Sequence, residues 1–569
     1  MGRASLTYGE QQAPVPSFIT SSKAERSSAF HDDVSKYERL SLQLDDGSEL
    51  DYCILGDGTA CILAASPSGD AIALPIQIDG HDVLSLGERC LFGYHKLTCV
   101  ILPDHLVTIG PFALAGTGIT EIALPQTLRR IEYKAFFNCH SLTDAQVAPE
   151  LEHIGPGAFE STALSGFWIP ATVTEIGFDA FHNSAVRAAL PLPTFAIDPH
   201  NPRYCLDRYG ALYRIDGEHC VLQQMLEKTT EAIAIMDGCE LVERKAFFRH
   251  GRLRQVVLPS SLTTIEEKAF QYCERLTDVS NTEGLASVGN HAFQGSSLRK
   301  FAVGSHLESL GECALYTGES PTRIVPPSLK EIVVAQDNPR YYAVSGMLIE
   351  RRGARDDRLL IYAGDAPEII VPDAVTEICP YAFSNVEGPV RLVLHDHIHT
   401  VGLLGFAFGR TLREIVLASN ECEEGFVEFR FPAGTQAQGA VRASFYSCTV
   451  NPKEIMYAAD SNMLSCTRSF EWATYAIWRL QKPYYISDHA QDVMKNGLKA
   501  KACKTCLEFA QRRYMQGFSD LMDLEIINLE NIGEIIGELG EQGEPEAVGY
   551  LMRLKRNKYG DTRDVNFDL

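Results

Sequence analysis

Two short stretches of the sequence carry the residue types that bind metals or do redox chemistry. Cys503 and Cys506 form a C-x-x-C pair, and the segment HDHIH at 395–399 is the densest histidine cluster. A zinc site needs two more ligands at suitable spacing, and no second C-x-x-C exists. A thioredoxin-like site needs a strand before the pair, and none is visible. Because the two cysteines fall on one helical stripe with Leu507 and Ala510, we expect them to pack in a helical core.

The histidine cluster allows two interpretations. His397 and His399 could share a transition metal, which is the basis of an alternative hypothesis of a metal-dependent enzyme using His395–His399. The other interpretation is a solvated turn, which we favour because His395 stands where a repeat described below places a proline. The chain has no P-loop, G-x-S-x-G, H-E-x-x-H or helix-opening G-x-G-x-x-G motif. We therefore predict a protein that is not an enzyme and needs no cofactor or metal.

Composition restricts the class of partner and the location. The chain has 569 residues with a formal net charge of -23, and a surface this acidic repels phosphate backbones, which excludes nucleic acid as the expected partner. No apolar run reaches the ~20 residues of a membrane helix, and the first residues lack a secretory apolar core. The sixteen cysteines show no dense short-loop framework. These features predict free thiols in a cytoplasmic protein, with the cell surface as the alternative.

The chain repeats itself. IEYKAFFNCHSLTDA at 131–145 and IEEKAFQYCERLTDV at 265–279 share residues at the same offsets. An aliphatic residue four positions before each Ala-Phe-like pair recurs at steps of 22 or 23 residues. These anchors are Leu86, Ile109, Ile131, Ile154, Ile176, Val242, Ile265, Val288, Leu310, Ile378 and Val401. A period of 20–29 residues rich in Leu and Ile indicates a leucine-rich-repeat solenoid.

Each period contains a short strand and a turn. The strand has the form L-T-x-I-x-L-P, as in ITEIALP at 119–125, and its alternation places the x residues on the outer face. The turn has the form I-G-x-x-A-F, in which Ala fits below the neighbouring turn and Phe fills the space between coils. Cys139 and Cys273 share one place in the longer turns and are expected to be small buried side chains.

These two phrases resemble the BspA-like leucine-rich-repeat family over about residues 40–420. The resemblance implies a bacterial solenoid with a parallel sheet, and many members of that family are thought to be surface adhesins. We predict an α+β chain: a leucine-rich-repeat solenoid with β-hairpin inserts, followed by a small all-α module. The boundaries are a disordered leader at 1–38, a solenoid at 39–432, a linker at 433–450 and a helical module at 451–560.

Two gaps in the repeat predict the inserts, at about 191–236 and 318–370. They share a phrase, DPHNPRYCLDRYGALY at 198–213 and QDNPRYYAVSGMLI at 336–349, in which Asn-Pro starts a turn and Gly suits a tight reversal. We interpret NPRY as structural turns, with a ligand motif as the alternative. The segment 42–80 has the same turn chemistry and is expected to cap the solenoid.

The C-terminal region changes to a helical period. Ile532, Ile535, Ile536 and Leu539 lie at i, i+3, i+4 and i+7, and Phe470, Ala473, Ile477 and Leu480 mark an earlier helix. Gly543 can end one helix and Pro545 can start the next. The pair at 530–558 weakly resembles the helix pair of an ankyrin-type repeat, without its T-P-L-H phrase.

The predicted function is protein–protein interaction, because a solenoid exposes a ladder of x residues that the core does not constrain. Several of these x residues are large or acidic. The candidate binding residues are Trp168, Glu121, Asp144, Gln146, Asp278 and Glu331. Exposed Trp is a frequent hot spot of binding energy, so Trp168 is the leading candidate. A cell-surface adhesin is the alternative function, and the partner is expected to be a protein.

Overall fold

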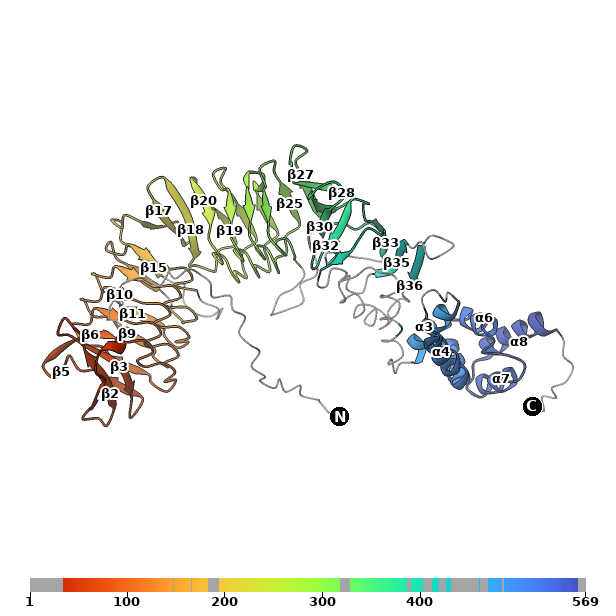
Figure 1. Ribbon diagram of the computed structural model, residues 1–569, viewed down its shortest axis with the longest axis horizontal. Helices are drawn as coiled ribbons and strands as arrows, with labels where there is room; N and C mark the ends of the chain where they lie inside the picture. Colours follow the sequence, from red (N-terminus) through yellow and green to blue (C-terminus); the bar gives the residue numbers. More distant parts are fainter. Residues whose placement is uncertain are drawn as a thin grey trace. The chain divides into compact units, whose positions relative to one another are not determined.

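The computed structural model describes residues 34–560 except 147, 165, 183–193, 318–327, 385, 387–389, 403–411, 419–425, 431–459, 461–468, 482 and 484–485 (Figure 1). The chain divides into two compact units, Met1–Arg203 (unit 1) and Tyr204–Leu569 (unit 2). Each unit contains repeat coils, and unit 2 also contains the helices. No described helix is long and apolar enough to cross a bilayer.

In unit 1 one sheet begins with antiparallel strands and continues with parallel ones. After a 3-10 turn at Val34–Lys36, its strands in spatial order are β1 (Leu40–Gln43), β2 (Glu49–Ile54), β3 (Ala60–Ser66), β6 (His81–Leu86), β8 (Thr108–Ile109), β10 (Arg130–Ile131), β12 (His153–Ile154) and β14 (Glu175–Ile176), and β5 (Gln77–Ile78) pairs with β6. The first three form the predicted N-terminal cap, and each later strand carries one predicted anchor.

A second set of short strands in unit 1 forms the surface that we call the strand face. Its parallel pairs are β4 (Ala71–Ala73) with β7 (Cys99–Ile101), β9 (Glu121–Ala123) with β11 (Asp144–Gln146), and β13 (Gly166–Ile169) with β15 (Thr194–Ile197). The central residue of a strand is buried and its neighbours are exposed, as for Ile122 between Glu121 and Ala123. The predicted alternation is therefore confirmed.

The core between these surfaces is a column of stacked rings and small residues. Phe136, Phe159 and Phe181 stack on successive coils with centroids 5.0 and 5.6 Å apart and nearly parallel planes. The alanines before them, Ala135 and Ala158 among them, are fully buried. Cys139 is also buried, and its thiol donates to the Leu114 carbonyl at 3.1 Å. The structure thus confirms the roles predicted for Ala, Phe and Cys in the turn.

The turns stack through their backbones in an unusual conformation. Arg89, Phe112 and Lys134 have φ between 53° and 58°, a left-handed region that costs ~1–2 kcal/mol for a residue with Cβ. The geometry aims their N–H groups at the following coil, where Phe112 N donates to the Tyr133 carbonyl at 3.0 Å. Satisfying these backbone donors offsets the local strain, so the turns of successive coils are held in register.

Unit 2 repeats the plan with two antiparallel inserts. The first ladder runs β16 (Tyr204–Leu206), β17 (Ala211–Asp216), β18 (His219–Met225), β20 (Cys239–Val242), β22 (Thr264–Ile265), β24 (Ser287–Val288) and β26 (Ser309–Leu310). The second runs β28 (Tyr341–Val344), β29 (Met347–Glu350), β30 (Asp357–Tyr362), β32 (Val375–Ile378) and β34 (Thr400–Val401). In each, three antiparallel strands lead into parallel ones, which confirms the predicted hairpin inserts. Gly210 and Gly346, both with φ near +80°, make the reversals.

The strand face of unit 2 has three described groups of strands. They are β19 (Ala232–Ala234), β21 (Gln255–Val257) and β23 (Asp278–Ser280); then β25 (Lys300–Val303) and β27 (Glu331–Val334); then β31 (Glu368–Ile370), β33 (Val390–Leu394), β35 (Leu412–Ala418) and β36 (Phe426–Arg430). A 3-10 turn, Thr282–Gly284, lies between β23 and the next coil. β36 pairs antiparallel with β35 and ends the described strands.

The described helices of unit 2 share one apolar core. They are α3 (Ser469–Gln481), α4 (Asp488–Ala500), α5 (Ala502–Gln511), α6 (Gln516–Asp523), α7 (Ile532–Glu541) and α8 (Pro545–Tyr559). Gly543 has φ 77° after α7, and Pro545 is the first residue of α8, as predicted. The linker at 433–450 and residues 1–33 of the leader lie outside the described residues, so the predicted domain boundaries remain expectations.

Candidate interaction surface

On the strand face, the exposed residues of successive strands line up in two columns. The first column holds the residue before each buried central residue, and the second column holds the residue after it. In unit 1 the parallel register places Asp144 opposite Glu121 and Gln146 opposite Ala123. Because neighbouring strands lie ~4.8 Å apart, side chains of one column are direct neighbours.

The first column of unit 1 contains two adjacent carboxylates. Glu121 and Asp144 are exposed and are register partners on β9 and β11. Neither carboxylate makes a hydrogen bond or ion pair with another residue in the described part of the chain. Like charges directly opposite each other destabilise a sheet, so this pair contributes nothing favourable to the fold.

In the first column of unit 2, each acid has a hydrogen-bond or ion-pair partner on a neighbouring strand. Gln255 Nε2 donates to Asp278 at 3.0 Å, and Lys300 Nζ donates to Glu331 at 2.9 Å. Further along, Arg391 pairs with Glu368 and, at 2.9 Å, with Glu414. The acids of unit 2 therefore have partners within the face, whereas those of unit 1 do not.

The second column carries large apolar side chains. In unit 1, Ile101 is 60% exposed and Trp168 is 46% exposed, with the exposed side chains of Ala123 and Gln146 between them along the column. In unit 2, Val333 and Ile370 occupy second-column positions and are also exposed. Side chains this apolar on an outer face have no packing role in the fold.

The six candidate binding residues are all exposed on strand faces. The structure brings Glu121, Asp144, Gln146 and Trp168 together in unit 1, and it places Asp278 and Glu331 in unit 2. Prediction from the sequence missed Ile101, Val333 and Ile370. The signal was present, because each is a large aliphatic residue at an x position, where the core does not require one.

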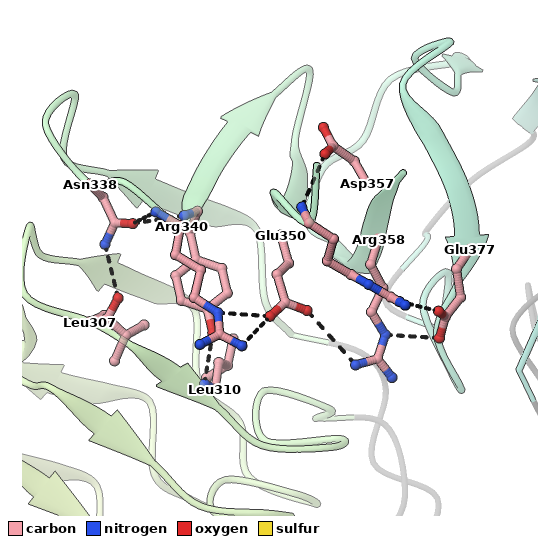
Figure 2. A network of polar contacts seen from close by, with 10 residues as sticks. Leu307, Leu310, Asn338, Arg340, Glu350, Asp357, Arg358 and Glu377 are labelled. Atoms are coloured by element: carbon pink, nitrogen blue, oxygen red, sulfur yellow. Dashed lines mark hydrogen bonds and ion pairs between the residues drawn. The ribbon is translucent and has the colours of Figure 1, made fainter. Parts of the chain in front are cut away.

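The NPRY segments at 201–204 and 338–341 both have a structural role. Asn338 is buried, and its Nδ2 donates to the carbonyls of Gly304 at 2.7 Å and Leu307 at 3.2 Å. Its Oδ1 accepts from the backbone N–H groups of Arg340 and Tyr341 (Figure 2). In unit 1, the Asn201 side chain likewise donates to the carbonyls of Pro170 at 2.9 Å and Val173 at 3.0 Å. The asparagine side chain thus donates to backbone carbonyls of the preceding coil at the point where the parallel pairing stops.

The second insert is also fastened by a chain of ion pairs (Figure 2). Glu350, only 7% exposed, accepts from Arg340 Nε at 2.9 Å and lies 3.8 Å from Arg358. Arg358 Nε is 2.9 Å from Glu377 Oε1, and Arg352 also pairs with Glu377. The alternating charges connect β29, β30 and β32, which gives this cluster a structural role rather than a catalytic one.

Within the histidine cluster, both ring nitrogens of His395 are occupied by backbone contacts. His395 Nε2 lies 2.8 Å from the Pro372 carbonyl, and its Nδ1 accepts from the His397 N–H at 3.3 Å. Burial lowers the pKa of His395, which keeps the ring neutral with its proton on Nε2. His399 Nδ1 contacts Thr400 Oγ1. With both His395 nitrogens engaged, the ring has no lone pair to offer a metal.

The C-x-x-C pair lies on α5, as expected for a core position. Cys506 is fully buried in the helical core, and burial raises the pKa of its thiol. Cys503 is half-buried, and its pKa is raised as well. Raised thiol pKa values oppose both metal binding and thiolate chemistry. In the part of the chain that the structure describes, no group of three His, Cys, Asp or Glu side chains could hold a metal.

Comparison with known proteins finds one matching family and several distantly related solved structures. Residues 75–187 and 229–333 match the family described as BspA type leucine rich repeat region, in six copies. No curated protein matches the sequence.

Several solved structures match at low identity. A leucine rich cell surface protein from Faecalibacterium prausnitzii is 17% identical over 62% of this chain and 95% of its own, with a TM-score of 0.39. The pneumococcal vaccine antigen PcpA is 14% identical over 66% and 96%, with a TM-score of 0.45. A leucine-rich repeat protein from Eubacterium ventriosum is 15% identical over 68% and 100%, with a TM-score of 0.40. The residues that match the family, 75–187 and 229–333, carry the anchors from Leu86 to Leu310 with their strands and stacked Phe column, and these parts of the chain are similar to BspA-type leucine-rich repeats.

Proposed function

We propose that this chain is a non-enzymatic interaction scaffold whose strand face in unit 1 binds a protein partner. The observation that carries the proposal is the juxtaposition of exposed Ile101 and Trp168 in one column with the unpaired Glu121 and Asp144 in the adjacent column. Large apolar anchors supply binding energy, and neighbouring carboxylates select for basic groups. The partner is therefore a protein segment with Lys or Arg beside an apolar anchor.

The contrast between the two units supports this choice of surface. The acids of unit 2 are compensated within the face by Gln255, Lys300 and Arg391. Glu121 and Asp144 repel each other, and a basic side chain placed between them relieves that repulsion. Other coils of unit 1 fold without large outer residues, since Ala73 and Ala123 occupy second-column positions and are exposed. The large residues at 101 and 168 are thus not demanded by the repeat.

Charge reversal tests the proposal. A tagged double variant, Glu121→Lys with Asp144→Lys, is compared with wild type in quantitative affinity capture, and each enriched protein is then purified for a direct binding measurement. We expect its affinity to fall at least tenfold, with a salt dependence that the variant abolishes. The control is Asp278→Lys with Glu331→Lys in unit 2, which should leave the affinity unchanged. If wild type and the unit 1 variant bind the partner with equal affinity, the proposal that this surface binds the partner is wrong.

A further inference from the structure

A second surface of unit 1 carries a row of aromatic residues. We call the surface formed by the turns after the buried anchors the turn face. Backbone hydrogen bonds join the turns of successive coils. Phe112 N donates to the Tyr133 carbonyl, and Gly157 N donates to the Phe178 carbonyl, both at 3.0 Å. Pro111, Tyr133, Pro156 and Phe178 therefore occupy one position on successive coils, the first row. Phe92, Ala115 and Phe137 occupy another, the second row, through the 2.8 Å bonds from Gly93 N and Gly116 N.

Three aromatic residues of the two rows are exposed and a fourth, Phe137, is half-buried, and ring contacts join those on neighbouring coils through Phe112. Phe92 is 49%, Tyr133 41% and Phe178 43% exposed. Phe112 lies between the rows, with its ring centroid 6.2 Å from that of Phe92, 5.2 Å from Tyr133 and 6.5 Å from Phe137, edge to face in each case. A contiguous exposed aromatic surface of this kind marks a binding site in a soluble protein.

The fold does not require aromatic residues in these rows. In unit 2 the first-row position is held by polar residues, namely Arg244, Glu267, Asn290 and Glu312, whose coils stack through the same backbone bonds. At the second-row position two successive coils carry Gln271 and Gln294, while the flanking coils carry Phe248 and Tyr316. Stacking of the coils therefore does not depend on the chemistry of these side chains, and the aromatic residues of unit 1 require another explanation.

The turn face of unit 1 is close to neutral. The Arg89 guanidinium lies 5.6 Å from the ring centroids of both Phe92 and Phe112, and it is 3.8 Å from Glu88. The Lys134 ammonium lies 4.1 Å from the Phe137 centroid and 3.3 Å from Glu160. Since each cation has its own acid, the surface selects a ligand by shape and apolar contact rather than by net charge.

The spacing of the aromatic rings indicates the shape of that ligand. Along both rows the aromatics recur on every second coil, at Tyr133 and Phe178 and at Phe92 and Phe137, with Pro156 or Ala115 between them. Successive coils are 5.0–5.6 Å apart at the stacked rings, so this repeat is roughly 10 Å. A polyproline II helix advances about 9 Å in one turn of three residues. Rings with this spacing meet a proline at every third position.

We propose that the turn face of unit 1 binds a proline-rich segment in the polyproline II conformation, running along the stack of coils. Such segments dock on aromatic side chains at low entropic cost because their conformation is already formed. The partly exposed Pro111 and Pro156 add apolar contact between the rings. This surface is separate from the strand face and does not depend on the function proposed for it.

The test uses the full chain and a synthetic peptide, (Pro-Pro-Ser)4, titrated by calorimetry or fluorescence anisotropy. The flexible peptide (Ala-Gly-Ser)4 is the ligand control. We expect binding of the proline peptide alone, weakened about tenfold or more by Tyr133→Asn and by Phe92→Gln. Both substitutions place at these positions a residue that unit 2 already carries there, so both variants should keep the melting temperature of the wild type. Trp168→Ala, on the strand face, should leave peptide binding unchanged.

Three outcomes would overturn the proposal. They are no binding of the proline peptide by wild type, equal binding of the flexible peptide, or binding that neither Tyr133→Asn nor Phe92→Gln weakens. Neutral cellohexaose is titrated in parallel. If it binds in a way that both variants weaken while the proline peptide does not bind, the aromatic rows are a glycan surface and the proline-rich ligand is excluded.

Discussion

Phe270 and Phe293 lie 23 residues apart in the sequence, yet their rings stack with centroids 5.1 Å apart and planes inclined by only 3°. Both side chains are fully buried. The contact is repeated by the neighbouring pair, Phe247 and Phe270, at 4.7 Å. One coil cannot bury its own ring, so each Phe is completed by the coils on either side.

The first prediction follows from this stacking. Phe270→Ala should lower the free energy of unfolding by about 3–5 kcal/mol, because it leaves a cavity between two coils. Chemical denaturation measures the change, and Phe92→Ala, at an exposed turn position, is the control and should cost less than about 1 kcal/mol. A loss below about 1 kcal/mol for Phe270→Ala would mean that the ring column is not part of the core.

Buried His250 predicts a pH dependence. It is fully buried, its Nδ1 accepts from the Leu253 N–H at 3.1 Å, and burial together with nearby Lys228 lowers its pKa to about 4. The unfolded chain holds a proton on this ring at higher pH, with a pKa near 6.5. Between pH 6.5 and 4 the unfolded state therefore binds more protons, and stability falls as the pH falls through this window, by up to ~3 kcal/mol from this group.

The repeat itself supplies the control for this effect. Cys139 and Cys273 occupy the position of His250 in other coils, where their thiols donate to a carbonyl of the preceding coil. We expect His250→Cys to fold and to remove this part of the acid sensitivity between pH 6.5 and 4, as measured by denaturation at several pH values. An unchanged pH profile in the variant would show that His250 is not the titrating group.

The asparagine of the second NPRY phrase should matter for stability. Asn338→Ala removes four hydrogen bonds and leaves the buried carbonyl of Gly304 without this donor, so we expect a loss of about 2–4 kcal/mol. Its exposed neighbour supplies the control, and Asp337→Ala should change stability by less than about 0.5 kcal/mol. Comparable melting curves for both variants would contradict the structural role of the phrase.

The thiols should be free in the native protein. The thirteen described cysteines are unpaired, and burial raises the pKa of Cys61 and Cys273 to about 12, which slows oxidation. Thiol titration of denatured protein without reductant should therefore count close to sixteen. Cys53 and Cys61 face each other across β2 and β3, so a mapped bridge there would contradict the prediction. It would also favour the cell surface over the cytoplasm.

Much of the fold was predictable because the same residue types recur at the same positions in many coils. The anchor at Ile131, the small Ala135 and the ring of Phe136 recur in coil after coil, and each repetition reinforces the period. The inserts were predictable from Asn-Pro and Gly, which specify turns locally. The course of the ion pairs around Glu350 was not, because it depends on which strands the insert brings together.

The candidate site was predictable only in part. The alternation along ITEIALP was enough to predict that Glu121 lies on the outer face, and the same alternation predicted this for Trp168. It could not show that the Asp278 side chain has Gln255 as a partner while that of Asp144 has none among the described residues, because pairing depends on the register between coils. The aromatic rows of the turn face were missed, since the first-row positions carry polar residues in unit 2 and the second-row positions carry both polar and aromatic residues, so neither shows a period of its own.

The central claim is that the strand face of unit 1 is a docking surface, and the most direct measurement is the affinity of Trp168→Ala for a partner isolated with the wild-type chain. We expect the variant to lose about 2 kcal/mol or more of binding free energy, while its unfolding free energy stays within about 0.5 kcal/mol of wild type. The control is Leu529→Ala, which removes a side chain that is 52% exposed in the helical region and should not change the affinity. A Trp168→Ala variant that binds the partner as tightly as wild type would contradict the account.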